Sequence, residues 1–196
     1  MEPTKNSLFA AHPAKGQGTL IQYNAHLMGP GLVMTGYADA ARRLQNSYDG
    51  QPWDDVMLLP FMFVWRQAIE LALKKNIKNL AEMRRQNDAT DPELAREVVA
   101  DRLRLKIGHD LKKLISEQQI HNTALGLQEI PEDVLETLEL LAAMDRSGTG
   151  FRYAGVLKQE SIDIDFSSIG AALDKAFRLL EVVIDAATYG EGVDWS

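Results

Sequence analysis

The chain has 196 residues, of which 45% are hydrophobic and 25% charged, as in an ordinary globular protein rather than a disordered or fibrous one. It contains no cysteine, which excludes a disulfide scaffold, a thiolate metal site and a cysteine nucleophile, and fits a cytoplasmic setting. The net charge of −7 argues against general attraction to nucleic acid or anionic lipid. No apolar run is long enough to span a bilayer, so we expect a soluble protein with no membrane partner.

The basic residues are concentrated in the middle of the chain. Residues 66–113 contain twelve basic and eight acidic side chains, a balance of +4, which leaves −11 for the remainder. Such a block predicts either a local anion-binding face or a solvated helix face whose charges are paired with nearby acids.

Apolar periodicity predicts an all-α protein. Residues 1–30 show no such period and are expected to form an irregular arm, followed by one helical domain over 31–196. The expected architecture is a single antiparallel bundle of five to six helices, with a short β-hairpin near 151–166 as the only candidate strands. The helices are expected over 32–48, 55–86, 92–105, 109–119, 132–145 and 166–189.

Residues that cap or interrupt helices set the expected boundaries. Asp54 or Asp55 is expected to cap the long second helix, while Asp91 and Asp165 are expected to cap later ones. Gly108 is expected to break the helical pattern. The outward face of the first helix is expected to carry Arg42 and Arg43.

The first candidate site is a column of charges on the long helix. Arg66, Glu70 and Lys74 follow one another at four-residue steps beside the apolar stripe. Arg66 lies in an unusually apolar stretch, so it needs a partner, and Glu70 is the nearest candidate. The column is therefore either an ion pair inside the bundle or part of a binding site.

The second candidate site surrounds a histidine. His109 follows Gly108 and has Arg102 and Arg104 within one or two turns. An imidazole suits general acid–base catalysis and arginine holds phosphate, which together suffice for metal-free RNA cleavage through the 2′-hydroxyl. Alternatively, His109 caps the following helix and bonds a backbone group or Asp145.

The third candidate site is a glycine-containing loop that begins at Asp145 and ends at Phe151, Arg152 and Tyr153. The aromatic and basic side chains can stack a base and clamp a phosphate. Alternatively, the two rings fill the bundle while Arg152 pairs with Glu70 or Asp145.

Common catalytic and metal motifs do not occur. The chain has no phosphate-binding P-loop, no HExxH, no GxSxG and no EF-hand loop, and its four histidines lack helical metal-ligand spacing. We therefore predict neither a metal site nor a cofactor.

Four segments resemble the HEPN-like helical proteins of bacteria. They are Leu59 to Lys74, Gly108 to Leu114, Asp145 to Tyr153 with its Phe-Arg-Tyr end, and Ile162 to Asp165. The resemblance implies an all-α bundle, a homodimer, and a place in toxin–antitoxin, defence or RNA-processing systems. Active members carry an arginine and a histidine with four to six residues between them. Four residues lie between Arg104 and His109 and six between Arg102 and His109, so both arginines fit, although leucine follows each of them.

Two functions follow as expectations from the resemblance and the residues. In the first, the protein is a metal-independent endoribonuclease or RNA-binding module, with His109 and Arg104 catalytic. In the second, it is a non-catalytic dimeric interaction protein, with a partner such as an antitoxin and polar clusters that are structural. In a third interpretation, the protein binds a small anionic ligand or a nucleotide through Arg66, Lys74, His109 and Arg152. The binding residues expected for the RNA site are Arg66, Glu70, Lys74, Arg102, Asp145, Arg152 and Tyr153.

Overall fold

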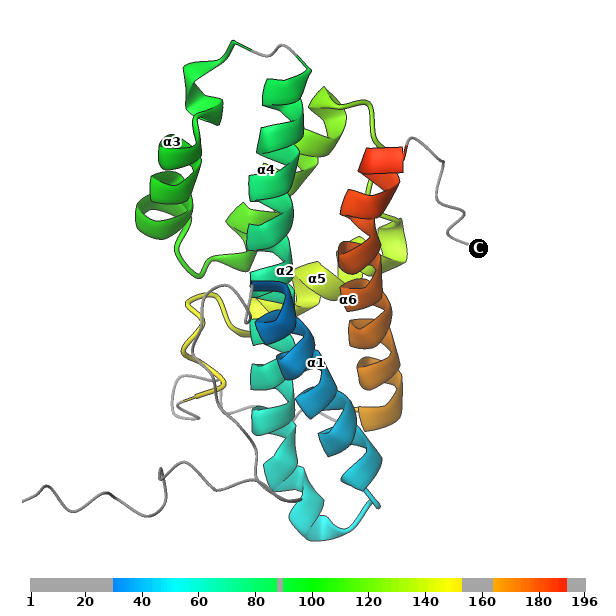
Figure 1. Ribbon diagram of the computed structural model, residues 1–196. Coiled ribbons are helices and arrows are strands. Elements are labelled where there is room, and N and C mark those ends of the chain that lie inside the picture. Colours follow the sequence, from blue (N-terminus) through cyan, green and yellow to red (C-terminus); the bar gives the residue numbers. More distant parts are fainter. Residues whose placement is uncertain (1–29, 88–89, 153–163, 190–196) are drawn as a thin grey trace, which may run out of the picture.

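The computed structural model describes residues 30–87, 90–152 and 164–189, and all regular structure within these ranges is helical, which confirms the all-α class. Figure 1 shows the elements gathered into a bundle. The predicted arm and most of the predicted hairpin lie outside the described residues. The α-helices are α1 (Pro30–Ser47), α2 (Leu58–Gln86), α3 (Arg96–Asp101), α4 (Leu111–Ala124), α5 (Glu132–Met144) and α6 (Phe166–Tyr189). The shorter helical segments are η2 (Pro52–Met57), η3 (Pro92–Leu94) and η4 (Arg102–Ile107).

Helix α2 is the centre of the bundle. It runs the length of the molecule, antiparallel to α1 and α3, and it contacts α1, α3, α4 and α6 (Figure 1). Among the described residues, the span Pro52–Gln86 is the one helical span whose length and composition would allow it to cross a membrane, a test that the core helix of a soluble protein also passes. Its position within the bundle favours the soluble interpretation.

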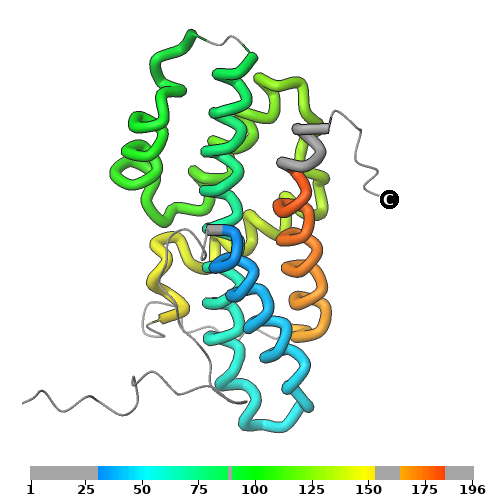
Figure 2. The backbone as a smooth tube through the Cα atoms, in the orientation of Figure 1, coloured from blue at the N-terminus to red at the C-terminus, as the bar shows by residue number. Residues whose placement is uncertain are grey.

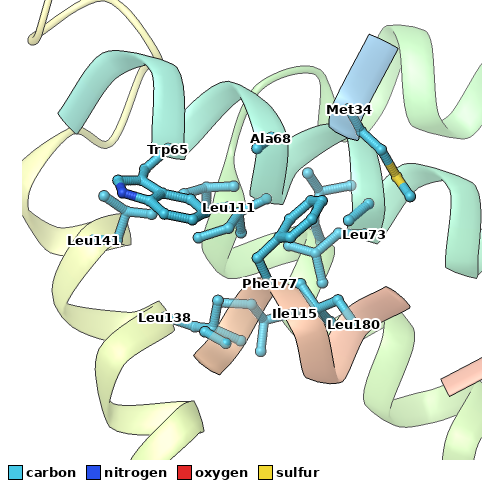
Figure 3. Packing of buried hydrophobic residues seen from close by; sticks show 14 of the residues in the cluster. Met34, Trp65, Ala68, Leu73, Leu111, Ile115, Leu138, Leu141, Phe177 and Leu180 are labelled. Carbon is cyan, nitrogen blue, oxygen red and sulfur yellow. The ribbon is translucent and has the colours of Figure 1, made fainter. Parts of the chain in front are cut away.

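The core joins α2 to the other long helices. The rings of Trp65 from α2 and Phe177 from α6 lie 6.1 Å apart between centroids, and Figure 3 shows leucines of α5 beside them. Ile69 and Leu73 continue the buried stripe of α2, as its helical spacing predicts. Burial of large apolar side chains on α2, α4, α5 and α6 holds the bundle together. It also holds α2 in place, and with it the polar side chains that α2 carries.

Two of the predicted caps are confirmed and one is wrong. The carboxylate of Asp91 accepts the backbone N–H of Glu93, and that of Asp165 accepts those of Ser167 and Ser168. Asp54, by contrast, lies inside η2, where its carboxylate accepts N–H groups from the preceding turn.

Arg42 is not on the outer face of α1 as predicted. It pairs with Asp174 of α6 at 2.7 Å, and its guanidinium lies 5.9 Å from the ring centroid of Trp65. Arg42 therefore lies across the contact between α1 and α6, while Arg43 is exposed as expected.

The third predicted helix is divided into η3, α3 and η4. The last segment is a π-helix that ends with the N–H of Gly108 donating to the carbonyl of Leu103, five residues back. Gly108 has φ +62°, which suits glycine and ends the helix as predicted. Asp110 then caps α4 by accepting the N–H of Lys113. His109 thus lies in a tight turn between η4 and α4, not at the start of a helix.

Candidate functional site

The candidate site is formed by three separate segments. They are the middle of α2, the turn 108–110 and the loop 145–152. Figure 2 shows the loop, in yellow, beside the connection from η4 to α4. Hydrogen bonds from side chains of α2 join both segments to the bundle.

Arg66 links the three segments. Its Nη1 lies 2.8 Å from Oε2 of Glu70, its Nη2 donates to the backbone carbonyl of His109 at 2.5 Å, and its Nε lies 3.3 Å from the carbonyl of Asp145. Nε is also 3.4 Å from a carboxylate oxygen of Asp145. The side chain is 0% exposed and every guanidinium nitrogen has a partner inside the protein. The predicted ion pair inside the bundle is confirmed, and Arg66 has no nitrogen left for an external phosphate.

The two carboxylate oxygens of Glu70 bind different partners, one of them buried and the others partly or largely exposed. Oε2 accepts from Arg66, while Oε1 lies 2.7 Å from Nζ of Lys74 and 2.8 Å from Nδ1 of His109. Burial raises the pKa of Glu70, but the hydrogen bonds and positive charges of Lys74 and His109 outweigh it and hold the pKa below its usual value. Glu70 is therefore an ionised carboxylate at neutral pH.

The ring of His109 is exposed, whereas its backbone is held by a buried side chain. The ring is 58% exposed, although the Glu70 side chain that binds it is only 3% exposed. Arg66 holds the backbone carbonyl of His109, and Glu70 holds the ring. The expectation that His109 caps α4 or bonds Asp145 is wrong, because Asp110 is the cap and Glu70 is the partner.

Asp145 folds the loop that covers this turn. One carboxylate oxygen accepts the N–H groups of Thr149 and Gly150, and the other accepts that of Phe151. Gly148 has φ +76°, and a Cβ built there would lie 2.9 Å from Nη1 of Arg66 and 3.1 Å from Cβ of His109. The loop therefore approaches the site so closely that only glycine fits at this position.

The end of the loop combines packing with an exposed cation. Phe151 is buried, as its packing interpretation predicts. Arg152 is exposed, and its guanidinium lies 5.2 Å from the ring centroid of Phe63, so it pairs with neither Glu70 nor Asp145. Tyr153 lies outside the described residues.

The two arginines that precede His109 by the expected spacing face other partners. Arg104 is 71% exposed and pairs with Asp101 at 2.9 Å. Arg102 pairs with Glu93 and Glu117. In the part of the chain that the structure describes, neither has a hydrogen bond or ion pair with His109, whereas Lys74 shares Oε1 of Glu70 with it.

The structure also contains a second polar cluster that the sequence did not predict. His121 of α4 is buried, its Nδ1 lies 3.2 Å from Arg84 and its Nε2 lies 3.6 Å from Glu117. Burial and the charges of Arg84 and Arg102 lower the pKa of His121 and outweigh the carboxylate of Glu117, which raises it. The signal in the sequence is weak, because His121 and Arg84 are 37 residues apart.

Within the described ranges, no group of three or more histidine, aspartate or glutamate side chains is arranged to hold a metal ion. A comparison of the chain with protein-family models, curated proteins and solved structures found no match. Function is therefore inferred from the residues of the site.

Proposed function

We propose that the protein is a HEPN-like, metal-independent endoribonuclease in which His109 is the general acid and base. The observation that carries this proposal is an exposed imidazole bound at 2.8 Å to a buried, ionised carboxylate. A carboxylate in this position orients the ring, as general acid–base catalysis requires.

The proposed reaction uses the 2′-hydroxyl of the RNA as nucleophile. His109 accepts the hydroxyl proton, the 2′-oxygen bonds to the adjacent phosphorus, and the bond to the 5′-oxygen breaks. The leaving 5′-oxygen takes this proton back from His109, which gives a 2′,3′-cyclic phosphate and a 5′-hydroxyl end and returns His109 to its neutral form. No metal is required if cations stabilise the charge that develops on the phosphate oxygens.

Lys74 and Arg152 are the cations best suited to this task. Lys74 shares Oε1 of Glu70 with His109, so its ammonium group lies next to the imidazole. Arg152 is exposed on the loop that covers the His109 turn, and it has no carboxylate partner in the part of the chain that the structure describes. Arg104 and Arg102 belong in this proposal to the wider RNA-binding face, or to a site completed across a homodimer.

The resemblance to HEPN-like proteins supports the biological setting. We place the protein in the cytoplasm as a homodimer of a toxin–antitoxin or defence system, with RNA as substrate and an antitoxin as a protein partner. The absence of cysteine is consistent with a reducing compartment.

The test is RNA cleavage by the purified full chain in EDTA. The expected result is cleavage of single-stranded RNA with 2′,3′-cyclic phosphate ends, and its loss in a His109→Ala variant that remains folded. No cleavage by the wild-type dimer, or equal cleavage by the variant, would exclude His109 as the catalytic group.

A second candidate function is a non-catalytic interaction protein. Its support is the complete burial of Arg66, whose partners on α2, the 108–110 turn and the 145–152 loop make it a structural link. In that case the His109→Ala variant binds the same partner protein as wild type, and neither cleaves RNA. Co-purification of a partner protein with wild type and with the His109→Ala variant separates this function from the first.

A further inference from the structure

Building on the proposed ribonuclease function, we propose that Glu70 and Arg66 are positioning residues that fix the neutral form of His109 as the tautomer with its proton on Nδ1. This makes Nε2 the atom that accepts and returns the proton of the substrate. The inference concerns the atoms of the ring and is testable without RNA.

The first step is the hydrogen-bonding capacity of Glu70. An ionised carboxylate only accepts hydrogen bonds, and the pKa of Glu70 lies below its usual value. The contact of 2.8 Å between its Oε1 and Nδ1 of His109 is a hydrogen-bond distance. Because Glu70 has no proton to give, the N–H must be on Nδ1.

The second step is the role of Arg66. Its guanidinium donates only and keeps its charge, so Oε2 of Glu70 is held by a permanent donor at 2.8 Å. The same guanidinium holds the backbone carbonyl of His109. Backbone and ring of His109 are thus fixed by one buried pair, and the carboxylate does not turn away from the ring.

The consequence concerns the other ring nitrogen. With Nδ1 engaged by Glu70, Nε2 is the nitrogen left to react on a ring that is 58% exposed. A histidine free in water carries the proton mainly on Nε2, where it blocks that atom as a base. Glu70 reverses this preference, so each neutral His109 is ready to accept a proton at Nε2.

His121 provides an internal comparison. Its Nδ1 faces Nη1 of Arg84 at 3.2 Å, and arginine has no acceptor, so Nδ1 of neutral His121 must accept. The proton of His121 is then on Nε2. One molecule therefore holds two histidines that are expected in opposite tautomers.

The experiment is nitrogen-15 NMR of the histidine rings in the labelled full chain, at a pH where the rings are neutral. The signals are assigned by their loss in His109→Asn and His121→Asn. The expected result is a proton on Nδ1 for His109 and on Nε2 for His121. A wild-type His109 protonated mainly on Nε2 would overturn the inference.

Glu70→Leu tests the cause, because leucine removes both acceptor oxygens, whereas glutamine would keep one. The Nδ1-protonated form of His109 is expected to fall from the dominant form to a minority, whereas the matched Glu117→Leu variant, beside His121, leaves His109 unchanged. An unchanged His109 tautomer in Glu70→Leu would also refute the inference. If Glu70→Leu does not fold, the wild-type comparison of the two rings decides alone. The tautomer is measured without RNA, so the two proposals can fail separately. A protein that shows the expected tautomer but cleaves no RNA would refute the ribonuclease function and leave the positioning role of Glu70 and Arg66 intact.

Discussion

Nδ1 of His109 lies 2.8 Å from Oε1 of Glu70, although 39 residues separate them in the sequence. This contact joins an exposed ring to the buried charge network of α2. The network pairs two cations, Arg66 and Lys74, with two carboxylates, Glu70 and Asp145, and so is electrically balanced while His109 is neutral. Such a balance permits burial of Arg66 without an unpaired charge.

Replacing Arg66 by alanine is expected to destabilise the protein by about 3–5 kcal/mol, because it leaves the buried Glu70 carboxylate without its partner and frees two segments from α2. The measurement is the free energy of unfolding in urea. Arg104→Ala is the control, since its pair with Asp101 is exposed, and it should cost roughly 0–1 kcal/mol. Equal losses in the two variants would contradict the linking role of Arg66.

Gly148→Ala is expected to reduce both stability and cleavage, because the new methyl group would meet the guanidinium of Arg66 and the Cβ of His109. Gly126→Ala is a matched control: its φ of +64° gives similar backbone strain, roughly 1–2 kcal/mol, but its Cβ would meet nothing within 4 Å. We expect a larger loss of melting temperature in Gly148→Ala than in Gly126→Ala. The same loss in both would show that the loop has room to move.

Acid is expected to weaken the fold through Glu70. Its pKa in the folded protein lies below the usual value of 4.5, so the unfolded chain binds the proton first. The stabilisation is complete above pH 4.5 and is lost as the pH falls through the lower, folded-state pKa. Unfolding free energies measured between pH 6 and 3 should fall more steeply for wild type than for Glu70→Gln. Parallel curves would contradict the ionised, hydrogen-bonded state of Glu70.

His121 is expected to add a second pH dependence at milder acidity. Burial lowers its pKa from 6.5, so the neutral ring is favoured in the fold, and stability present above pH 6.5 is lost as the pH falls through the folded-state pKa. The measurement is the free energy of unfolding between pH 7 and 5. In His121→Gln the part of its decline that is due to His121 should disappear, because glutamine does not titrate. If the free energy of unfolding of the variant falls as much as that of wild type, another group is responsible.

The helices were predictable because their apolar stripes are long and regular. The stripe of α2 through Trp65 and Leu73, and the caps Asp91 and Asp165, follow directly from spacing and local chemistry. Arg66 in an apolar stretch also indicated its buried pair with Glu70.

The tertiary contacts were not predictable in the same way. The His109–Glu70 contact depends on how the turn after η4 docks on α2, and spacing along the chain instead suggested Arg104 as the partner of His109. Asp145 gave no sign that its carboxylate folds its own loop. Contacts between segments far apart in sequence depend on packing, which a local pattern does not encode.

The central claim is that His109, held by Glu70, performs acid–base chemistry on RNA. The most direct measurement compares RNA cleavage rates of wild type, His109→Gln and Arg96→Ala in EDTA. We predict that His109→Gln lowers the rate by about 10²–10⁴-fold, while Arg96→Ala, at an exposed residue that is bound to Glu82 and has no role in the proposal, retains the rate within roughly tenfold. A His109→Gln variant as active as wild type would contradict the claim.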